Sequence, residues 1–359
     1  MERKLTIIGA GSTGHCAAAY FTLDGCEVTL CDTTRFLPAF NAIQKNGGIL
    51  LNGVSGKNGL AMPHKLTTDF QEALDGATHI FICVPAERHE EIAALCAPHG
   101  VPGQNYAIAP GNLGSVLFRR EFERLGTAKG VTFSEFAGNL FPCRLTGPAE
   151  CLIAVPFPPK KLVAFPACET EAAIKAFEPI MKLSPISSIF EAALNSHNVI
   201  LHMSMSVLNA VQIEKMGKDF AIFRDGATDG TVICARSVEE ERDAVMKLFG
   251  YQVFGSATEH LSRVKQYDQF PDLDLFRSLD GPDSLHHRYI VEDGLAGGAL
   301  MVSISKEYNL AAPTSEAFLH IGGLLCGIDF MQAGRTLKNL GMASLSLEDL
   351  KDVLEHGFR

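Results

Sequence analysis

The first half of the chain alternates short apolar runs with amphipathic stretches. Four of the apolar runs predict buried β-strands: residues 5–8, 27–31, 79–84 and 106–109. Segments with helical periodicity separate most of them. This alternation is typical of βαβ units, in which helices cover both faces of a parallel sheet. Three later runs predict additional strands that complete the same sheet: residues 133–136, 151–156 and 161–166.

The pattern changes from residue 191 onward, where helical periodicity dominates. The helices expected there cover residues 191–216, a segment opened by the capping box Ser237-x-x-Glu240, and residues 289–308, 315–330 and 347–355. The Asp- and Pro-rich residues 262–287 predict a long irregular loop suited to covering a site. The sequence therefore predicts an α/β domain over residues 1–187, followed by an all-helical domain over residues 188–359.

Composition narrows the class of protein. The chain has 359 residues, of which 47% are hydrophobic and 20% charged, which predicts a folded protein with a large core and two domains. A net charge of −10, with no Lys/Arg run longer than Lys160-Lys161, argues against a nucleic-acid or anionic-membrane partner. No apolar stretch approaches the ~18 residues that would span a bilayer.

The ten cysteines lie in apolar surroundings without C-x-x-C or other metal-ligand spacing. Reduced core thiols in a cytoplasmic enzyme without a metal site are the simplest interpretation.

A glycine-rich motif, Gly9-Ala10-Gly11-Ser12-Thr13-Gly14, lies between the first predicted strand and a helical run at residues 15–23. In this context the first glycine permits a tight turn. The second lets backbone N–H groups approach a pyrophosphate, and the third lets the helix pack closely on the strand. A glycine-rich turn without a ligand is the alternative. The position favours a dinucleotide, and we expect residues 1–187 to form a Rossmann-type domain.

Asp32 ends the second predicted strand, 23 residues after Gly9. A carboxylate near this position accepts a hydrogen bond from the adenosine ribose 2′-hydroxyl, which favours NAD over NADP. Arg35 is a competing signal, because a guanidinium there could hold a 2′-phosphate. NAD is the expected cofactor, and NADP stays open.

Polar side chains interrupt the otherwise apolar helix predicted around residue 200. They recur every three or four residues and share one narrow strip of the helix at ~100° per residue: Asn195, Asn198, His202, Ser206 and Asn209. Buried polar groups need partners, so the strip faces an internal hydrogen-bond network, a domain interface or a substrate cleft. His202 is a candidate acid/base if the cleft is the correct interpretation.

A second polar segment, His286-His287-Arg288-Tyr289-Ile290-Val291-Glu292-Asp293, precedes an apolar helical run at residues 295–304. In the structural interpretation, the acidic residues complement a helix terminus and Arg288 pairs with Glu292. In the functional interpretation, Asp293 orients a histidine and Arg288 binds a substrate carboxylate through two contacts. The residues alone do not favour either interpretation.

Several motifs together resemble the opine dehydrogenases, the octopine and nopaline dehydrogenase family, over residues 1 to about 341. They are Gly9-x-Gly11-x-x-Gly14, Pro110-Gly111, Pro142-Cys143-Arg144-Leu145, Asn198-x-x-x-His202, Phe223-Arg224-Asp225-Gly226, Glu241-Arg242 and His287-Arg288-Tyr289-x-x-Glu292-Asp293. The chain departs from the family pattern after Asp293, where Gly294-Leu295-Ala296-Gly297-Gly298 replaces a Val-Pro pair. Enzymes of this family condense an α-keto acid, often pyruvate, with the amino group of an amino acid and reduce the imine with NAD(P)H.

The resemblance implies that His202, Arg288 and Asp293 are the catalytic residues: a proton shuttle, a keto-acid anchor and an orienting carboxylate. In sheets of this kind the cofactor binds at the carboxyl ends of the strands, so residues following the third and fourth strands join the glycine motif as cofactor contacts: Val84, Pro85 and Gly111. Two further residues are candidate substrate contacts, Asn198 and Glu135, with a packing role for Glu135 an equal alternative.

Two other classes share the predicted plan. One is a hydroxyacid or polyol-phosphate dehydrogenase, which needs no amine, and the other is a nucleotide-sensing protein without turnover. The expected partners are small molecules, an α-keto acid and an amino acid, and a homodimer is the default expectation for assembly.

Overall fold

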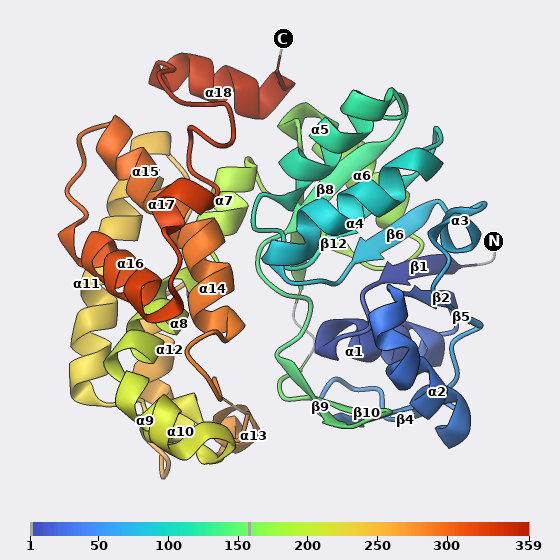
Figure 1. Ribbon diagram of the computed structural model, residues 1–359, viewed down its shortest axis with the longest axis horizontal. Coiled ribbons are helices and arrows are strands. Elements are labelled where there is room, and N and C mark those ends of the chain that lie inside the picture. The colour runs from blue at the N-terminus through green and yellow to red at the C-terminus, as the bar shows by residue number, and fades with distance from the viewer. Residues whose placement is uncertain (1–2, 157–158, 280, 359) are drawn as a thin grey trace. The chain divides into compact units, whose positions relative to one another are not determined.

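The computed structural model describes residues 3–156, 159–279 and 281–358, and the chain divides into two compact units (Figure 1). The first unit contains residues 1–192 and 353–359, and the second contains residues 193–352. The predicted helical domain extends to residue 359, whereas the last seven residues group with the first unit.

The first unit is built on an eight-stranded sheet with strand order β12-β11-β8-β7-β6-β1-β2-β5. Every pairing is parallel except β8 with β11. The strands are β1 (Lys4–Ile8), β2 (Glu27–Cys31), β5 (Lys65–Thr67), β6 (His79–Ile82), β7 (Asn105–Ile108), β8 (Thr132–Phe136), β11 (Lys160–Ala164) and β12 (Leu183–Pro185). The predicted parallel sheet is therefore confirmed.

One strand prediction is wrong in its placement. The run at 151–156 forms β10 (Glu150–Ile153), which does not complete the main sheet but pairs in a separate four-stranded sheet of order β4-β3-β10-β9. The other strands of that sheet are β3 (Ile49–Gly53), β4 (Gly59–Ala61) and β9 (Cys143–Gly147). The parallel partner of β10 is β3, about 100 residues earlier in the sequence, and a local hydrophobic pattern does not encode such a pairing.

Helices cover both faces of the main sheet. They are α1 (Ser12–Leu23), α2 (Leu37–Asn46), α3 (Phe70–Leu74), α4 (His89–Cys96), α5 (Gly114–Leu125) and α6 (Thr170–Phe177). Successive strand residues alternate between two apolar clusters: Phe81 packs in the cluster with α1 and α6, whereas Ile80 and Ile82 pack in the cluster with α3, α4 and α5. Burial on both faces explains why these strands read as continuous apolar runs.

In the described residues of the second unit, all regular structure is helical (Figure 1). Its helices are α8 (His197–Leu208), α9 (Ala210–Met216), α10 (Ile222–Asp225), α11 (Asp229–Phe249), α12 (Ala257–Val264), α13 (Asp274–Arg277), α14 (Arg288–Asp293), α15 (Ala299–Glu307), α16 (Pro313–Cys326) and α17 (Phe330–Ala333). A π-helical turn, Gly294–Gly298, joins α14 to α15. Two helices cross the unit boundaries, α7 (Ile189–Leu194) and α18 (Leu347–His356). None of the described helices is long and apolar enough to cross a membrane.

The helix predicted over residues 191–216 is divided into α7, α8 and α9. The first break is at Asn195, whose side chain donates to the Gln252 carbonyl and accepts from the Phe254 N–H. The second is at Asn209, whose side chain donates to the Met205 carbonyl. Asparagine competes for backbone hydrogen bonds in this way, which explains why it favours helix ends over helix interiors.

The predicted helix start at Ser237 is wrong. Helix α11 begins eight residues earlier, where Thr228 and Thr231 form the capping box. Ser237 lies within the helix and its hydroxyl pairs with the Thr314 hydroxyl at 2.7 Å. The predicted loop at 262–287 is also partly helical, since it contains the end of α12 and the whole of α13.

Candidate active site

The glycine motif connects β1 to α1 and has the close packing that its sequence predicts. A Cβ atom on Gly9, whose φ is +119°, would lie 2.4 Å from the Cys83 carbonyl oxygen. A Cβ atom on Gly14 would lie 1.7 Å from the Gly9 carbonyl oxygen. These two positions therefore require glycine for the fold itself.

Gly11 differs from the other two glycines, because a Cβ there would meet no atom within 4 Å. This glycine is the N-cap of α1 and provides no side-chain cap, and the first turn of the helix holds no acidic residue. Open space beside an uncapped helix N-terminus suits an anionic group such as a pyrophosphate. The residues present thus fit the phosphates of a dinucleotide.

The other predicted cofactor contacts lie at the same edge of the sheet. Val84 and Pro85 follow β6, and Gly111 follows β7, so with the glycine motif they stand at the carboxyl ends of neighbouring strands. A 3₁₀ turn, Ala86–Arg88, continues from Pro85 into α4. The carboxyl edge of a parallel sheet is where such folds bind their ligands.

Asp32 has a different environment from the one predicted. Its side chain is fully buried, and its carboxylate accepts hydrogen bonds from the backbone N–H groups of Ala10 and Thr33, each at 2.7 Å. Arg88 forms an ion pair with it, at 2.8 Å from Nη2 to Oδ1. Arg35, the competing candidate for holding a 2′-phosphate, is 64% exposed at its side chain and pairs with Glu91.

Glu135 is buried within the first unit, where it holds the backbone at the start of α5. Its carboxylate accepts hydrogen bonds from the N–H groups of Leu113 and Ser115, both at 3.1 Å, and from the Ser115 hydroxyl at 2.6 Å. A Cβ on Gly111 would lie 2.6 Å from the Glu135 Cβ. These contacts favour the packing interpretation of Glu135 over the substrate contact.

In the second unit, α8 and α14 lie side by side (Figure 1). Their packing brings His202 and Asp293 together. The distance from His202 Nδ1 to Asp293 Oδ2 is 2.8 Å, and both side chains are buried. The His202 ring also stacks on the Tyr289 ring, with 3.6 Å between centroids and 13° between planes. The imidazole is therefore fixed in orientation by a hydrogen bond and a parallel ring.

Burial raises the pKa of Asp293 to about 7, although the positive charge of Arg288 acts in the opposite direction. One proton lies between Nδ1 of His202 and the Asp293 carboxyl, whichever group carries it. Nε2 is then the ring nitrogen through which His202 could exchange a proton with a substrate.

Arg288 begins α14, one turn before Glu292. Its Nη1 lies 3.2 Å from the Glu292 carboxylate, and its guanidinium lies 4.9 Å from the Tyr289 ring centre. The structural pairing of Arg288 with Glu292 is therefore present. This contact uses one of the five N–H donors of the guanidinium, so the pairing is compatible with two further contacts to a substrate carboxylate.

The predicted polar strip has mixed roles. Asn195 and Asn209 form the hydrogen bonds to backbone groups described above, which are structural. The Ser206 hydroxyl is buried without a hydrogen-bond partner among the described residues. Asn198 is half-buried near the start of α8. Among the five residues of the strip, only His202 pairs with a carboxylate of the described residues, that of Asp293, as an acid/base residue would.

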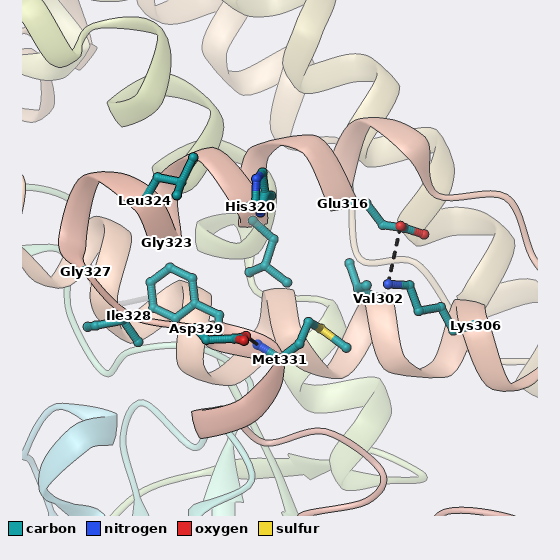
Figure 2. A pocket seen from close by; sticks show the side chains of 12 residues that line it. Val302, Lys306, Glu316, His320, Gly323, Leu324, Gly327, Ile328, Asp329 and Met331 are labelled. Atoms are coloured by element: carbon teal, nitrogen blue, oxygen red, sulfur yellow. Dashed lines mark hydrogen bonds and ion pairs between the residues drawn. The ribbon is translucent and has the colours of Figure 1, made fainter.

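A separate cavity of about 530 Å³ lies among α15, α16 and α17. Figure 2 shows its lining, which includes His320, Met331 and the ion pair of Lys306 with Glu316. His202 and Asp293 are not among the described residues that line it. In the part of the chain that the structure describes, no group of three or more His, Cys, Asp and Glu side chains could hold a metal ion.

Comparison with protein families matches two separate parts of the chain to different family models. Residues 185–326 match the model described as NAD/NADP octopine/nopaline dehydrogenase, alpha-helical domain. Residues 5–108 match the ketopantoate reductase PanE/ApbA model. A curated relative, the opine dehydrogenase of Arthrobacter sp. (strain 1C), is 28% identical over 360 residues, which cover 99% of both chains.

Residues 185–326 thus match the helical domain of the octopine/nopaline dehydrogenases, and the whole chain is similar to an opine dehydrogenase. Solved structures of such enzymes have the same fold. An octopine dehydrogenase solved with NADH and L-arginine aligns with a TM-score of 0.66 at 16% identity, covering 99% of this chain and 98% of the other. A yersinopine dehydrogenase solved with NADP⁺ aligns with a TM-score of 0.66 at 10% identity, with the same coverage.

The contacts in the structure add residues that the sequence did not identify as part of the site. Tyr289 stacks on His202, and Glu292 accepts a hydrogen bond from Arg288. In the sequence, the only indication of these roles is that both residues follow Arg288 on one short helix. Arg88 contacts Asp32 from the 3₁₀ turn after β6, the strand on the other side of β1. Its only signal was its position just after β6, because an ion pair between separate strand ends leaves no periodic pattern.

The glycine-rich segment in which this chain departs from the family pattern is the π-helical turn after Asp293. A Cβ on Gly297 would lie 2.2 Å from Val199 Cγ2 in α8, and one on Gly294 would lie 2.6 Å from the Phe330 ring. Gly297 therefore lets the π-helical turn approach α8 closely, and Gly294 lets it approach α17. Single π-helical turns of this kind are frequent at functional sites.

Proposed function

We propose that this protein is an NAD(P)H-dependent opine dehydrogenase. It condenses an α-keto acid, such as pyruvate, with the amino group of an amino acid and reduces the resulting imine to a secondary amine dicarboxylate. The observation that carries the proposal is the buried His202–Asp293 pair, with Arg288 nearby, in a chain that aligns with an opine dehydrogenase over its full length.

His202 is the proton-transfer residue in this proposal. The amino substrate must lose a proton before it attacks the keto carbon, and the carbinolamine must gain one to release water. Nε2 of His202 serves both steps, while Asp293 holds Nδ1 and keeps the ring in one orientation. Stacking on Tyr289 restricts the ring further.

Arg288 is the proposed keto-acid anchor. A planar guanidinium binds a carboxylate through two parallel hydrogen bonds and fixes its orientation as well as its position. Glu292 and the Tyr289 ring hold the Arg288 side chain in place. The positive charge of Arg288 also favours the ionised form of Asp293.

The glycine motif and the residues after β6 and β7 would hold the dinucleotide. Gly11 leaves space for its phosphates, and Val84, Pro85 and Gly111 stand at the same sheet edge. When bound, the reduced cofactor supplies the hydride that converts the imine to the amine. Thr13 is held by hydrogen bonds to Asn139, which orders the first turn of α1.

A hydroxyacid or polyol-phosphate dehydrogenase is the second candidate, favoured by the match of residues 5–108 to the ketopantoate reductase model. That match covers only part of the dinucleotide-binding unit, whereas the residues with acid/base chemistry lie in the helical unit. The two candidates differ in one requirement, because only an opine dehydrogenase needs an amine.

The test is a substrate matrix. Pyruvate, oxaloacetate and 2-oxoglutarate are each combined with a panel of amino acids, and NADH or NADPH consumption is followed by absorbance. We expect consumption only when a keto acid and an amine are both present, with the secondary amine identified by mass spectrometry. Equal consumption without any amine would favour the second candidate, and no consumption with any pair would overturn the proposal.

A cytoplasmic location is part of the proposal. It is supported by the ten cysteines, all of which are free and eight of which are buried. Proteins in a reducing compartment keep such thiols unpaired.

A further inference from the structure

The carboxylate of Asp32 has no hydrogen-bonding position left for a ligand. Oδ2 accepts from the Ala10 N–H at 2.7 Å and from Arg88 Nη1 at 3.3 Å. Oδ1 accepts from the Thr33 N–H at 2.7 Å and from Arg88 Nη2 at 2.8 Å. A carboxylate offers about four acceptor positions, and these four contacts occupy them. The usual recognition of a ribose 2′-hydroxyl by this residue is therefore displaced.

Arg88 is the group that covers Asp32. Its side chain is 13% exposed, and its Nε donates to Glu91 at 2.9 Å. The guanidinium also lies over the Phe36 ring, 5.4 Å from the ring centre. Three nitrogens of one guanidinium are thus held by two carboxylates and an aromatic face, which fixes a positive charge at the end of β2.

Glu91 binds a second cation in the same cluster. Arg35 donates to both Glu91 oxygens, at 2.7 and 2.9 Å, with a side chain that is 64% exposed. The cluster therefore contains two guanidiniums and two carboxylates. Its buried half, Asp32 with Arg88, is neutral as a pair.

We infer that Arg88 determines the selectivity between NADH and NADPH, and that it makes the ribose site accept a 2′-phosphate. This inference rests on the proposed function. An Asp32 carboxylate without Arg88 would repel a phosphate at the ribose 2′ position, whereas the ion pair removes that repulsion. The guanidinium then presents its outward N–H donors to the phosphate, a geometry that arginine matches well.

Binding of the two reduced cofactors tests the inference without any turnover. NADH and NADPH differ only in the 2′-phosphate, and each is titrated into the protein while nicotinamide fluorescence is recorded. The parent protein should bind both, with dissociation constants within about tenfold of each other. In Arg88→Gln, the dissociation constant for NADPH should rise by about tenfold or more, the usual effect of losing one charge-assisted contact. The constant for NADH should change less than about threefold.

A matched control is Arg119→Gln, since Arg119 is also partly buried in the first unit and pairs with two carboxylates, Glu123 and Glu169. Arg119→Gln should leave the ratio of the NADH and NADPH dissociation constants unchanged. Glu91→Gln provides a second, independent test, because it releases Nε of Arg88 and all the described contacts of Arg35. That variant should bind NADPH about threefold or more tighter, while NADH binding stays constant.

Three results would count against the inference. Parent protein that binds NADH at least a hundredfold tighter than NADPH overturns it, as does an Arg88→Gln variant that weakens both cofactors equally. An unchanged ratio in Glu91→Gln contradicts it even if Arg88→Gln fails to fold. If the parent binds neither cofactor, the proposed function fails and this inference fails with it, so the two failures are distinguishable.

Discussion

His202 shows how one buried side chain acquires a chemical role from its neighbours. The hydrogen bond to Asp293 and the ring of Tyr289 hold the imidazole, so the loss of the ring removes the proposed proton shuttle. We expect His202→Ala to lower kcat by roughly 10² to 10⁴, the usual contribution of a positioned acid/base. NADH affinity, measured by fluorescence, should stay within about threefold.

A purely structural role for His202 makes the opposite prediction. Its removal would then cost on the order of 1 to 3 kcal/mol of stability, with turnover reduced only as far as unfolding reduces it. Ser206→Ala is the matched control one turn later on α8, because it removes a buried hydroxyl without a described partner. The control should keep both kcat and melting temperature, and a His202 variant that melts early yet turns over normally would contradict the assignment.

The pKa of Asp293 predicts how the stability of the protein depends on pH. Burial raises its pKa to about 7, compared with about 3.9 in an unfolded chain. The folded protein therefore holds a proton that the unfolded chain releases, and the associated stability is present below pH 4 and lost as the pH rises through 7. Asp293→Asn lacks this titration, so its melting temperature relative to the parent should rise between pH 5 and pH 8. If the difference in melting temperature between Asp293→Asn and the parent is the same at pH 5 and pH 8, the pKa of Asp293 is not raised into this range.

Arg288 is expected to be sensitive to a change that preserves its charge. In Arg288→Lys, an ammonium replaces the planar fork and loses two-point recognition of a carboxylate. The KM for the keto acid should rise by about tenfold or more, whereas NADH affinity should not change. Kinetics identical to those of the parent would leave Arg288 as the ion-pair partner of Glu292 and nothing more.

At the scale of elements, the approach of α14 to α8 depends on the π-helical turn. A methyl group at Gly297 would lie 2.2 Å from a methyl of Val199, so Gly297→Ala must push the two helices apart. We expect a loss of about 1 to 3 kcal/mol in unfolding free energy, together with lower kcat as Asp293 moves from His202. Urea denaturation and steady-state kinetics measure the two effects.

Gly230→Ala is the control for Gly297, because a Cβ in this first turn of α11 meets only one atom, at 3.8 Å. It should be neutral or slightly stabilising. Adding Val199→Ala to Gly297→Ala removes the opposing methyls and should recover part of the loss. A Gly297→Ala variant as stable and active as the parent would mean that the helices do not require this close contact.

The sequence predicts elements with a local signature better than it predicts pairings. Strand β2 is predicted with its observed ends, since an apolar run bounded by polar residues is visible in one window. The second sheet is not, because β10 finds its partner β3 far away along the chain. The site shows the same difference. The glycine motif and the Arg288–Asp293 segment are contiguous, whereas the Arg88–Asp32 pair joins residues that follow two separate strands.

At the scale of the whole molecule, the last residues of the chain return to the first unit. Phe358 packs against Phe165, with 5.8 Å between ring centres, and the Arg120 guanidinium lies 5.2 Å from the Phe358 ring. Phe358→Ala should lower the unfolding free energy by about 1 kcal/mol, the usual contribution of an aromatic pair. Differential scanning calorimetry should show the change, while kcat stays at the parent value. No change in melting would mean that the terminus is not part of the fold.

The return of the terminus has a consequence for biosynthesis. A ribosome makes the chain from its N-terminus, and domains usually fold in that order as they emerge. Here residues 1–192 emerge early, yet the segment that completes their unit, residues 353–359, is synthesised only after residues 193–352. The helical unit is thus made in full while the nucleotide-binding unit still lacks its final contacts. That unit reaches its complete packing only after residues 353–359 have emerged behind the helical unit.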